Sequence, residues 1–586
     1  MKSVSGKYWE EEKYNQRIID KIKVENNFSE LITRLIIRNS FDKDEIYSIN
    51  NDLEITNPFK KNKDFLNAVK IFNHSILNKE KICIIGDYDV DGCISTSLIV
   101  KILKIQKIPH FYHIPNRFKD GYGANLELLK KIIEKKPNLI ILVDNGSNAI
   151  ESINFLNKHS IRTIIIDHHE IYKPYPKCGS LINPKKDTSS LNYSYFCSAV
   201  LTYFFLEIYL NKKSLKFNLK ENLILVLMAI ISDVMPLRKI NRLIAIKVIK
   251  NLNSYDNYIF RKIFEIKKIN KPIEIDDFAF LFGPIINSIG RIDDANDVVN
   301  LLCTNNIKKK DELINKLIKS NEKRKLIEEH ALKEINFKKI TLNSEPIIFL
   351  DKGNFNEGII GIIASRLKYY FNKPSVVLTK SGNLFKGSSR STKNFNIGLY
   401  IKRAIDQNIL ETGGGHNLAA GFSVKKGNIN VLKEFLIDAY NAEKPIISNN
   451  YLYEISLNAI NKNFVDEINS LNPYGEGIKR PLFLIKNIKI TKPKIIKDKF
   501  IKCYLKNKSS KMLPAVSFNY IGSDITKNLL YNKKEVNLII QLNEKFWNNK
   551  KQQQIIIVDL LYDSNNAWLK HFFTIKNSNS VPSSIG

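Results

Sequence analysis

The feature that most constrains the fold is the segment Gly86-Asp-Tyr-Asp-Val-Asp-Gly92, which follows directly after the apolar run from Ile82 to Ile85. An apolar run that ends at a glycine predicts a buried strand followed by a turn. The turn carries Asp87, Asp89 and Asp91, and carboxylates so close together repel one another unless a divalent cation lies between them. We interpret the segment as half of a metal site. The alternatives are a solvated acidic turn and an EF-hand-like calcium loop, although the closing Glu of such a loop is missing downstream.

The same arrangement recurs further along the chain. The run from Leu139 to Val143 ends in Asp144, and the run from Arg162 to Ile166 ends in Asp167-His168-His169. A helix-like stretch from Ala124 to Lys135 precedes the first of these runs, which is typical of βαβ units in a parallel sheet. Because ligands bind beyond the carboxyl ends of such strands, we expect the acidic and imidazole groups to converge on one edge.

A fourth candidate is Asp233, which follows the almost wholly apolar segment from Leu223 to Ile231. A single Asp after a buried helix is more often a cap than a ligand. Four clusters that each follow an apolar element directly are nevertheless hard to explain as independent accidents. Carboxylates with few imidazoles and no thiolate favour Mn²⁺ or Mg²⁺ over a structural zinc ion.

Length and charge agree with a large nucleic-acid-binding protein. A chain of 586 residues is too long for one core and predicts three or four domains. Its 91 Lys and Arg against 59 Asp and Glu give a formal charge of +32, which suits a polyanionic partner. The abundance of Lys, Ile and Asn, as expected from an AT-rich genome, contributes to this charge, so the charge alone does not prove nucleic-acid binding.

The cysteines and the apolar runs bear on the compartment. The six cysteines are scattered without a CxxC pair, which indicates neither a disulfide framework nor a zinc site and fits a reducing cytoplasm. The N-terminus lacks the apolar core of a signal peptide, and the longest apolar run is far short of the roughly 20 residues that span a bilayer. We therefore expect no membrane segment.

Nine ordered blocks resemble a known family. Gly86 to Gly92, Asp144, Asp167-His168-His169 and Ser232-Asp-Val-Met-Pro-Leu237 resemble the four motifs of the DHH phosphoesterases in residues and spacing. Five further blocks are similar to the signatures of the RecJ family of single-strand-specific 5′-to-3′ exonucleases: Pro115 to Gly123, Asn287-Ser-Ile-Gly-Arg291, Gly358 to Arg366, Gly387-Ser-Ser-Arg-Ser391 and Gly413 to Phe422. The last three blocks are similar to those of an associated domain called DHHA1.

The residue patterns and the resemblance together predict a fold of class α/β: a DHH domain with a doubly wound parallel sheet, a long connecting helix, a second α/β (DHHA1) domain and a C-terminal OB-type β-barrel. The alternative for the connecting helix is a solvated surface helix. The boundaries that we expect are 1–55 for an N-terminal lead-in, 56–300 for the DHH domain, 301–342 for the connecting helix, 343–445 for DHHA1 and 446–586 for the barrel. Five β-rich runs support the barrel independently of the resemblance. Such a barrel is a common platform for binding single-stranded nucleic acid. These runs are Leu482 to Ile490, Phe500 to Leu505, Leu513 to Phe518, Val536 to Leu542 and Gln554 to Leu560.

The resemblance also implies a site with two divalent metal ions, Mn²⁺ or Mg²⁺. Asp87, Asp89 and Asp144 would hold one ion, and the other would be held by Asp91, Asp144, His168 and Asp233. Asp167 and His169 are expected to orient ligands or to contact phosphate, with a strand-end cap as the alternative for Asp167. The residues expected to take part in catalysis are Asp89, Asp91, Asp144, His168, His169 and His416.

Four further residues occupy positions where RecJ-like enzymes bind the terminal phosphate: Arg117, Arg291, Ser388 and Arg390. Bidentate arginine together with hydroxyl groups suits that task. The glycines from Gly413 to Gly415 permit close backbone approach to a phosphate, and His416 is expected to polarise the scissile one. A structural ion pair remains the alternative for Arg291, and a tight turn for the glycines.

The function that the resemblance implies is a 5′-to-3′ exonuclease specific for single-stranded DNA in recombination and repair. The implied partners are single-stranded DNA, single-strand binding protein and a RecQ-type helicase, and we expect a cytoplasmic monomer. One alternative is a DHH-family phosphoesterase acting on short oligonucleotides or other small phosphodiesters, which are usually shorter chains without the barrel. The other alternative is an inactive nucleic-acid-binding relative, which the intact set of ligands disfavours.

Overall fold

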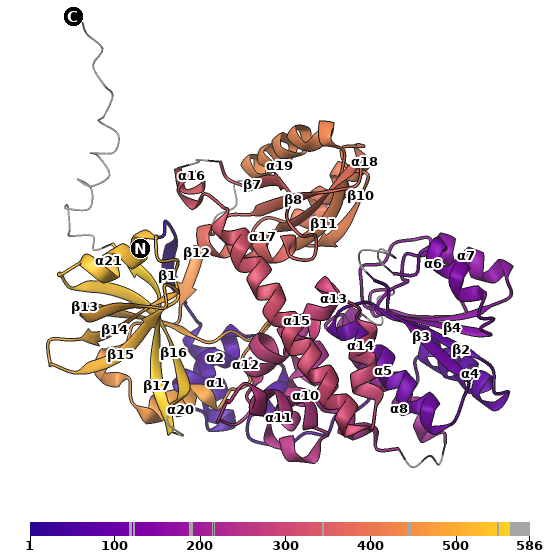
Figure 1. Cartoon of the computed structure of the whole chain (residues 1–586). Coiled ribbons are helices and arrows are strands. Elements are labelled where there is room, and N and C mark those ends of the chain that lie inside the picture. Colours follow the sequence, from indigo (N-terminus) through magenta and orange to yellow (C-terminus); the bar gives the residue numbers. More distant parts are fainter. Residues whose placement is uncertain are drawn as a thin grey trace, which may run out of the picture. The chain divides into compact units, whose positions relative to one another are not determined.

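The computed structural model describes residues 1–116, 120, 123–186, 191–213, 215, 217–342, 345–443, 448–547 and 550–562 (Figure 1). The chain divides into two compact units. The first unit contains Met1–Phe41, Asn336–Asn472 and the chain from Lys479 onward, and the second contains Asp42–Ile335 with Pro473–Ile478. Among the described helices, none is both long and apolar enough to cross a membrane.

The second unit is built around a five-stranded parallel sheet with strand order β3-β2-β4-β5-β6. The strands are β2 (Ile82–Ile85), β3 (His110–His113), β4 (Leu139–Val143), β5 (Arg162–Ile166) and β6 (Ser180–Ile182). Because β2 has β3 on one side and β4 on the other, the direction of winding reverses between β2 and β4. The parallel sheet expected from the sequence is confirmed, and ligands bind at such a reversal point.

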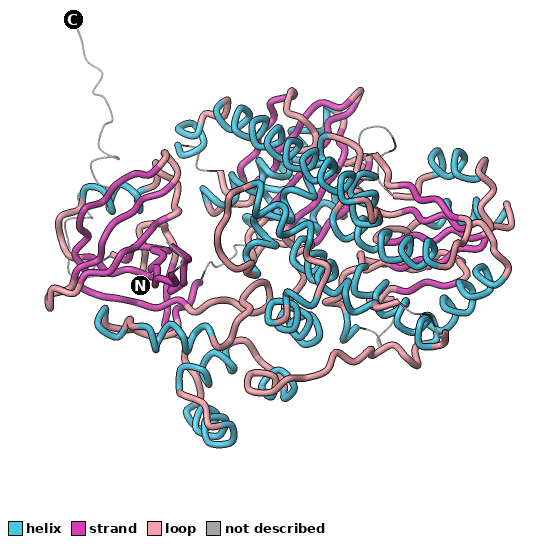
Figure 2. The backbone as a smooth tube through the Cα atoms, turned by 60° about the horizontal axis from the view of Figure 1, so that its bottom comes forward, coloured by secondary structure: helices cyan, strands magenta, loops and turns pink. Residues whose placement is uncertain are grey.

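Alternate residues of the strands enter two separate hydrophobic clusters. Ile84 and Ile141 belong to the larger cluster, whereas Cys83 and Ile140 belong to a smaller one on the opposite face. Since successive strand residues point to opposite faces, this division shows that both faces of the sheet are buried. Figure 2 shows helices on both faces, as a doubly wound sheet requires.

Three of the described helices of the second unit lie between strands in βαβ order, and the others precede or follow the sheet along the chain. The helices of this unit are α3 (Lys43–Tyr47), α4 (Lys63–Leu77), α5 (Val90–Ile105), α6 (Leu126–Ile133), α7 (Ile150–Lys158), α8 (Ser198–Asn211), α9 (Leu223–Ser232), α10 (Lys239–Lys250), α11 (Tyr258–Ile266), α12 (Ile275–Asp277), α13 (Gly283–Ile292), α14 (Asn296–Cys303) and α15 (Ile307–Lys333). The expected long helix is α15, with 27 residues. A π-helical turn, Phe278–Phe282, leads into α13.

The first unit contains a mixed sheet with strand order β10-β11-β9-β8-β7. Its strands are β7 (Ile348–Gly353), β8 (Ser375–Ser381), β9 (Leu384–Arg390), β10 (Thr412–His416) and β11 (Ala419–Val424). Only the pair of β7 and β8 is parallel among these described strands. The accompanying helices are α16 (Phe337–Leu342), α17 (Ile360–Phe371), α18 (Ile397–Asp406) and α19 (Ile429–Glu443). The second α/β domain is therefore confirmed.

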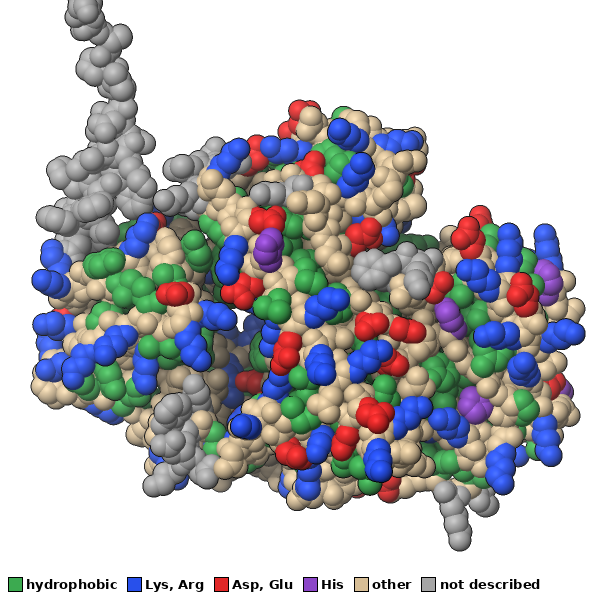
Figure 3. Space-filling model, viewed as in Figure 1, with side chains coloured by type: hydrophobic (Ala, Val, Ile, Leu, Met, Phe, Trp, Pro, Cys, Tyr) green, Lys and Arg blue, Asp and Glu red, His purple; other side chains and the backbone are tan. Residues whose placement is uncertain are grey.

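The same unit contains the expected five-stranded barrel, which is closed in the order β13-β14-β15-β17-β16. Its strands are β13 (Leu482–Ile496), β14 (Phe500–Lys506), β15 (Met512–Ser517), β16 (Val536–Trp547) and β17 (Lys550–Leu561), with α20 (Lys462–Asn469) before the barrel and α21 (Asp524–Tyr531) between β15 and β16. Several strands run further than the apolar runs indicated. In Figure 3, Lys and Arg side chains lie among hydrophobic ones over the barrel.

The N-terminal residues join the barrel. Strand β1 (Tyr8–Glu11) pairs in parallel with β12 (Ser448–Tyr451), and α1 (Gln16–Asn26) and α2 (Glu30–Arg38) follow it. The indole Nε1 of Trp9 donates to the buried carboxylate of Asp559, in β17, at 2.8 Å. The segment expected as a lead-in of residues 1–55 is thus shared between the two units, because residues from Asp42 onward belong to the other one.

Candidate metal centre

The acidic turn after β2 is shaped by its glycines and by the start of α5. Asp89 is the N-cap of α5, and its carboxylate accepts a hydrogen bond from the backbone N–H of Gly92 at 3.1 Å. A Cβ atom at Gly92 would lie 2.4 Å from the backbone nitrogen of Asp87, so only glycine fits here. The turn therefore folds tightly enough to bring Asp87, Asp89 and Asp91 to the end of the sheet.

Asp144 follows β4 at the reversal point of the sheet. Its φ of 63° lies in the left-handed region, which Asp adopts more readily than most residues. Its backbone N–H donates to the carbonyl of Ile166 at 2.9 Å, and only 1% of the residue is exposed. The strained backbone turns a buried carboxylate toward the acidic turn after β2.

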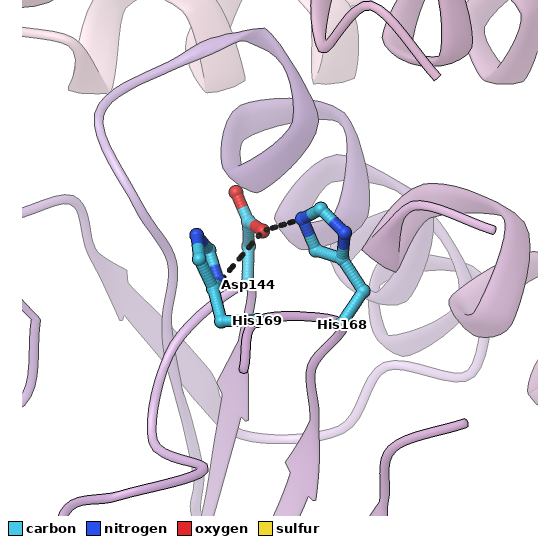
Figure 4. A group of neighbouring side chains, drawn as sticks. All are labelled: Asp144, His168 and His169. Atoms are coloured by element: carbon cyan, nitrogen blue, oxygen red, sulfur yellow. Dashed lines mark ion pairs between the residues drawn. The ribbon is translucent and has the colours of Figure 1, made fainter. Parts of the chain in front are cut away.

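The loop after β5 supplies two imidazoles that flank Asp144 (Figure 4). The Nε2 atom of His168 lies 3.3 Å from Oδ1 of Asp144, and the Nδ1 atom of His169 lies 3.9 Å from the same oxygen. His168 Nε2 also lies 3.4 Å from Oδ2 of Asp233 and 3.8 Å from Oδ2 of Asp91. One imidazole nitrogen thus faces three carboxylates that come from three different elements.

Three groups of side chains at this site each present their ligand atoms within 4.8 Å of one another. The first group is Asp87, Asp89 and Asp144; the second is Asp91, His168 and Asp233; the third is Asp144, His168 and His169. The structure therefore brings all six expected metal ligands together. Asp144 belongs to the first and the third of these groups, whereas the second group, which contains the other ligands expected for the second ion, does not include it.

The charges at the site favour a cation. Burial, and then the charge of Asp91, raises the pKa of Asp144 well above its usual range, while burial and the charges of Asp91 and Asp89 do the same for the pKa of Asp233. Burial and the charge of Asp89 raise the pKa of Asp91 to about 6. Oδ2 of Asp144 is buried and has no hydrogen-bond partner among the described residues. An unpartnered oxygen among mutually repelling carboxylates fits Mn²⁺ or Mg²⁺, both of which bind oxygen ligands.

Asp167 holds the two histidines in place. Its Oδ1 accepts hydrogen bonds from the backbone N–H groups of His168 and His169 and lies 2.8 Å from Nδ1 of His169, while Oδ2 accepts from the backbone of Ser147. Burial alone would raise the pKa of Asp167, but the charges of His169 and His168, together with the hydrogen bonds from His169 and Ser147, outweigh it and hold that pKa far below its usual range. Burial likewise would lower the pKa of His169, yet Asp167 raises it to about 9. Asp167 is thus both a strand-end cap and an orienting partner.

Asp233 is the C-cap residue of α9, as the simpler interpretation of the sequence proposed, and its carboxylate still belongs to a ligand group. The next residue, Val234, has a φ of 55°, which is unusual for a β-branched side chain. A cap position and a ligand position are therefore compatible here, because the helix ends where the cluster lies.

Helix α13 packs against the acidic turn and carries Arg291 in its last turn. The side chain of Asn287 accepts a hydrogen bond from the backbone N–H of Val90 at 3.1 Å, and a Cβ atom at Gly290 would lie 2.2 Å from the carbonyl oxygen of Tyr88. The glycine and the asparagine of this block thus serve close packing on the turn. Arg117, by contrast, lies outside the described residues.

The remaining expected residues lie in the first unit. Arg390 ends β9, and its guanidinium donates to Oγ of Ser388 at 3.2 Å. A Cβ atom at Gly361, in the first turn of α17, would lie 3.1 Å from both side chains, so the glycine leaves room beside them. His416 ends the exposed strand β10. Gly413 and Gly415 are explained by packing, since Cβ atoms there would collide with Phe422 and with the backbone of β11.

One further contact was not anticipated from the motifs. Ser198, at the start of α8, donates from Oγ to Oδ1 of Asp144 at 3.1 Å, and its backbone N–H donates to Asp91 at 2.7 Å. One signal for this contact is that Cys197, at the N-cap position of α8, provides no capping side chain. The first N–H groups of α8 therefore need an acceptor from another part of the chain.

Comparison with known proteins identifies the class. Models of the DHH family N-terminal domain, the DHHA1 domain and the RecJ OB domain match residues 81–230, 344–442 and 453–559 respectively. The chain belongs to the DHH/DHHA1 phosphoesterase superfamily. Within that superfamily, the combination with a RecJ-type OB domain makes it a member of the RecJ family.

Individual relatives agree with this assignment. The single-stranded-DNA-specific exonuclease RecJ of Bacillus subtilis is 26% identical over 567 residues, which are 94% of this chain and 70% of that protein. The corresponding protein of Haemophilus influenzae is 27% identical over 445 residues, 71% of this chain and 76% of that protein. The crystal structure of RecJ in complex with Mn²⁺ from Thermus thermophilus has the same fold, with a TM-score of 0.77 and 21% identity over 95% of this chain and 80% of that one.

Proposed function

We propose that this protein is a metal-dependent exonuclease that degrades single-stranded DNA from its 5′ end during recombination and repair. The observation that carries the proposal is the convergence of the six expected metal ligands, Asp144 among them, at the reversal point of the parallel sheet. Relatives named as single-stranded-DNA-specific exonucleases support the substrate class.

The ligands divide between two ions. Asp87, Asp89 and Asp144 would hold one ion, and Asp91, His168 and Asp233 would hold the other. Asp144 would also serve the second ion, since its Oδ1 lies 3.3 Å from Nε2 of His168. When bound, two divalent cations lower the pKa of a water molecule and stabilise the charge that develops on the phosphate. The fit of the oxygen-rich ligand set and the RecJ structures that contain Mn²⁺ or Mg²⁺ support these ions.

Other side chains act on the substrate directly. His169 is about one-third exposed and is kept protonated by Asp167, so it donates a hydrogen bond to a phosphate oxygen. Ser388 and Arg390 of the first unit bind the terminal 5′ phosphate, and His416 polarises the scissile phosphate. Arg291 of the second unit is a further phosphate-binding candidate, and Arg117, expected to do the same, lies outside the described residues. The already existing contact between Arg390 and Ser388 supports a shared role in binding a phosphate.

The barrel binds the single strand through its charged and aromatic side chains. In the pairing of β13 with β14, Lys489 stands opposite Lys506 and Lys494 opposite Lys502, with Tyr504 between the two pairs. Like charges directly opposite each other destabilise a sheet, and a phosphate backbone between them removes that repulsion. Exposed aromatic side chains of the barrel offer surfaces on which bases stack, and Phe518, directly after β15, is one of them. The barrel also disfavours the alternative of a phosphoesterase for short oligonucleotides.

The remaining parts of the proposal concern the cell. We propose that the protein acts as a monomer in the cytoplasm, on single strands exposed by a RecQ-type helicase and covered by single-strand binding protein. An exonuclease that needs single strands requires a supplier of this kind, because a duplex end does not provide them.

The experiment compares degradation of 5′-labelled and 3′-labelled single-stranded DNA in Mn²⁺, Mg²⁺ or chelator. We expect release of the 5′ label first, no reaction in chelator, and no cleavage of closed single-stranded circles or blunt duplex ends. In the same assay, Arg390→Ala should narrow the preference for 5′-phosphate over 5′-hydroxyl ends. Release of the 3′ label first, or rapid cleavage of circles, would contradict the proposal and favour a general DHH phosphodiesterase.

A further inference from the structure

We propose that Ser198 is a positioning residue for the metal centre: its hydroxyl orients Asp144, while the N-terminus of the same helix, α8, holds Asp91. The inference rests on the proposed function, since both carboxylates are ligands in the two-ion site. It assigns a role to a residue that lies outside the acidic motifs.

The first backbone N–H groups of α8 bind the carboxylate of Asp91. The backbone N–H of Ser198 donates to Oδ2 of Asp91 at 2.7 Å, and that of Ala199 donates to Oδ1 at 2.8 Å. The first N–H groups of a helix need acceptors from elsewhere, and the preceding residue, Cys197, provides no side-chain cap. The carboxylate of Asp91 fills this role from α5, and the positive end of the helix dipole favours its charged form.

The hydroxyl of Ser198 donates a hydrogen bond to Asp144, the other expected metal ligand that contacts α8. Its Oγ donates to Oδ1 of Asp144 at 3.1 Å, and Ser198 is fully buried. Oδ1 therefore has a donor, whereas Oδ2 is buried without a hydrogen-bond partner among the described residues. The contact fixes the plane of the carboxylate and leaves Oδ2 available for a cation.

A neutral donor suits this position better than a charged one. A lysine or arginine beside Asp144 would satisfy the carboxylate by charge and compete with a metal ion, whereas a hydroxyl orients it without supplying positive charge. Since both contacts come from consecutive residues of one helix, α8 sets the spacing between two ligands that belong to α5 and to the end of β4.

The test distinguishes the effect of the Ser198 hydroxyl on Asp144 from the effect of the α8 backbone on Asp91. Ser198→Ala removes Oγ but keeps the backbone N–H that holds Asp91. The matched control is Thr202→Val, one turn further along α8, because Thr202 is equally buried and its Oγ1 has no hydrogen-bond partner among the described residues. Ser198→Cys keeps the volume with a weaker donor. Binding of Mn²⁺ alone to the full-length proteins is measured by calorimetry, without DNA.

We expect Ser198→Ala to weaken Mn²⁺ binding by about 10- to 100-fold, the usual cost of losing a partner of a metal ligand. Ser198→Cys should be intermediate and Thr202→Val unchanged. Nuclease activity of Ser198→Ala should recover at high Mn²⁺ concentration, which a merely structural defect would not allow. If Ser198→Ala does not fold, the affinity of Ser198→Cys decides.

Three results would overturn the inference: wild-type Mn²⁺ affinity in both Ser198 variants, an equal loss in Thr202→Val, or activity of Ser198→Ala that excess Mn²⁺ does not restore. Each leaves the proposed function intact. Absence of Mn²⁺ binding in the wild-type protein would instead contradict the proposed function itself, so the two failures are distinguishable.

Discussion

Asp144 shows how a single residue combines strain, burial and charge at this site. Its left-handed backbone, its buried unpartnered Oδ2 and its raised pKa are all unfavourable in the protein without metal. Such features persist at functional sites because the surrounding structure enforces them. The cluster is therefore arranged for ion binding at the expense of stability.

The first prediction concerns the stability of the metal-free protein and its stabilisation by Mn²⁺. Asp144→Asn keeps a side chain that tolerates the left-handed region but removes one of the repelling charges. In chelator we expect a higher melting temperature than for the wild type, together with loss of Mn²⁺-dependent stabilisation and a fall in nuclease activity by orders of magnitude. Scanning calorimetry with and without Mn²⁺ measures this, with the exposed Asp44→Ala as control. A variant that Mn²⁺ still stabilised normally would contradict the shared role of Asp144.

The second prediction concerns pH. Because Asp167 raises the pKa of His169 to about 9, the protonated imidazole stabilises the fold fully below its unfolded pKa of about 6.5, and this stabilisation is lost as the pH rises toward about 9. In chelator, the melting temperature of the wild type should fall across that window. The melting temperature of His169→Gln should fall less over the same pH range. The melting temperature of the control His159→Gln, at an exposed position, should change as that of the wild type does. Identical curves for His169→Gln and the wild type would show that this pair does not titrate there.

At the scale of elements, β13 and β14 present two facing lysine pairs that no fold requirement explains. Strand β13 is long because it pairs with both β14 and β16 around the closed barrel, and a register shift between Thr491 and Lys494 bends it. The lysines point outward, since Ile501, Cys503 and Leu505, whose side chains point to the opposite face of β14 from Lys502 and Lys506, are fully buried. A face of this kind is complementary to a phosphate backbone.

The third prediction tests that face. Replacing Lys494 and Lys502 together by Gln should weaken binding to long single strands and reduce the slope of log affinity against log salt by about 1.4, given roughly 0.7 for each phosphate that is no longer neutralised. Lys486→Gln is the control on the same strand, because Glu454 already neutralises Lys486 at 2.7 Å. Fluorescence anisotropy at several salt concentrations measures both. An unchanged slope in the double variant would exclude this face from DNA binding.

At the scale of the whole molecule, the N-terminal segment completes the barrel unit from the far end of the chain. Asp559 is fully buried and accepts hydrogen bonds from Nε1 of Trp9 and from Oγ of Ser5. A buried carboxylate is costly unless such donors satisfy it. The N-terminal segment is thus a structural part of this unit.

The fourth prediction follows from that dependence. Trp9→Phe removes the indole donor and should destabilise the barrel by about 1–3 kcal/mol, the cost of a buried group that loses its partner. Tyr8→Phe, at an exposed position of the same strand, should have little effect. Hydrogen exchange of β17 reports on the barrel specifically. Equal protection of β17 in both variants would show that the barrel is stable without this contact.

Local pattern determined much of this protein. The apolar runs before Asp87, Asp144 and Asp167 predicted parallel strands, and the rule that such strands present their carboxyl ends at one edge was sufficient to predict that the carboxylates meet. The five β-rich runs predicted the barrel. These features succeed because each depends on residues close together in the chain, combined with a general rule of sheet topology.

Contacts between distant residues, by contrast, arise only when the chain folds. Ser198 meets Asp91 across 107 positions, and Trp9 meets Asp559 across 550. Strand lengths in the barrel likewise exceeded the apolar runs, because pairing with a neighbour extends a strand beyond its own hydrophobic pattern. Which side chains carry the chemistry can be read from local motifs. How those side chains are oriented depends on packing, since a carboxylate is fixed by donors that the fold brings from other helices and strands.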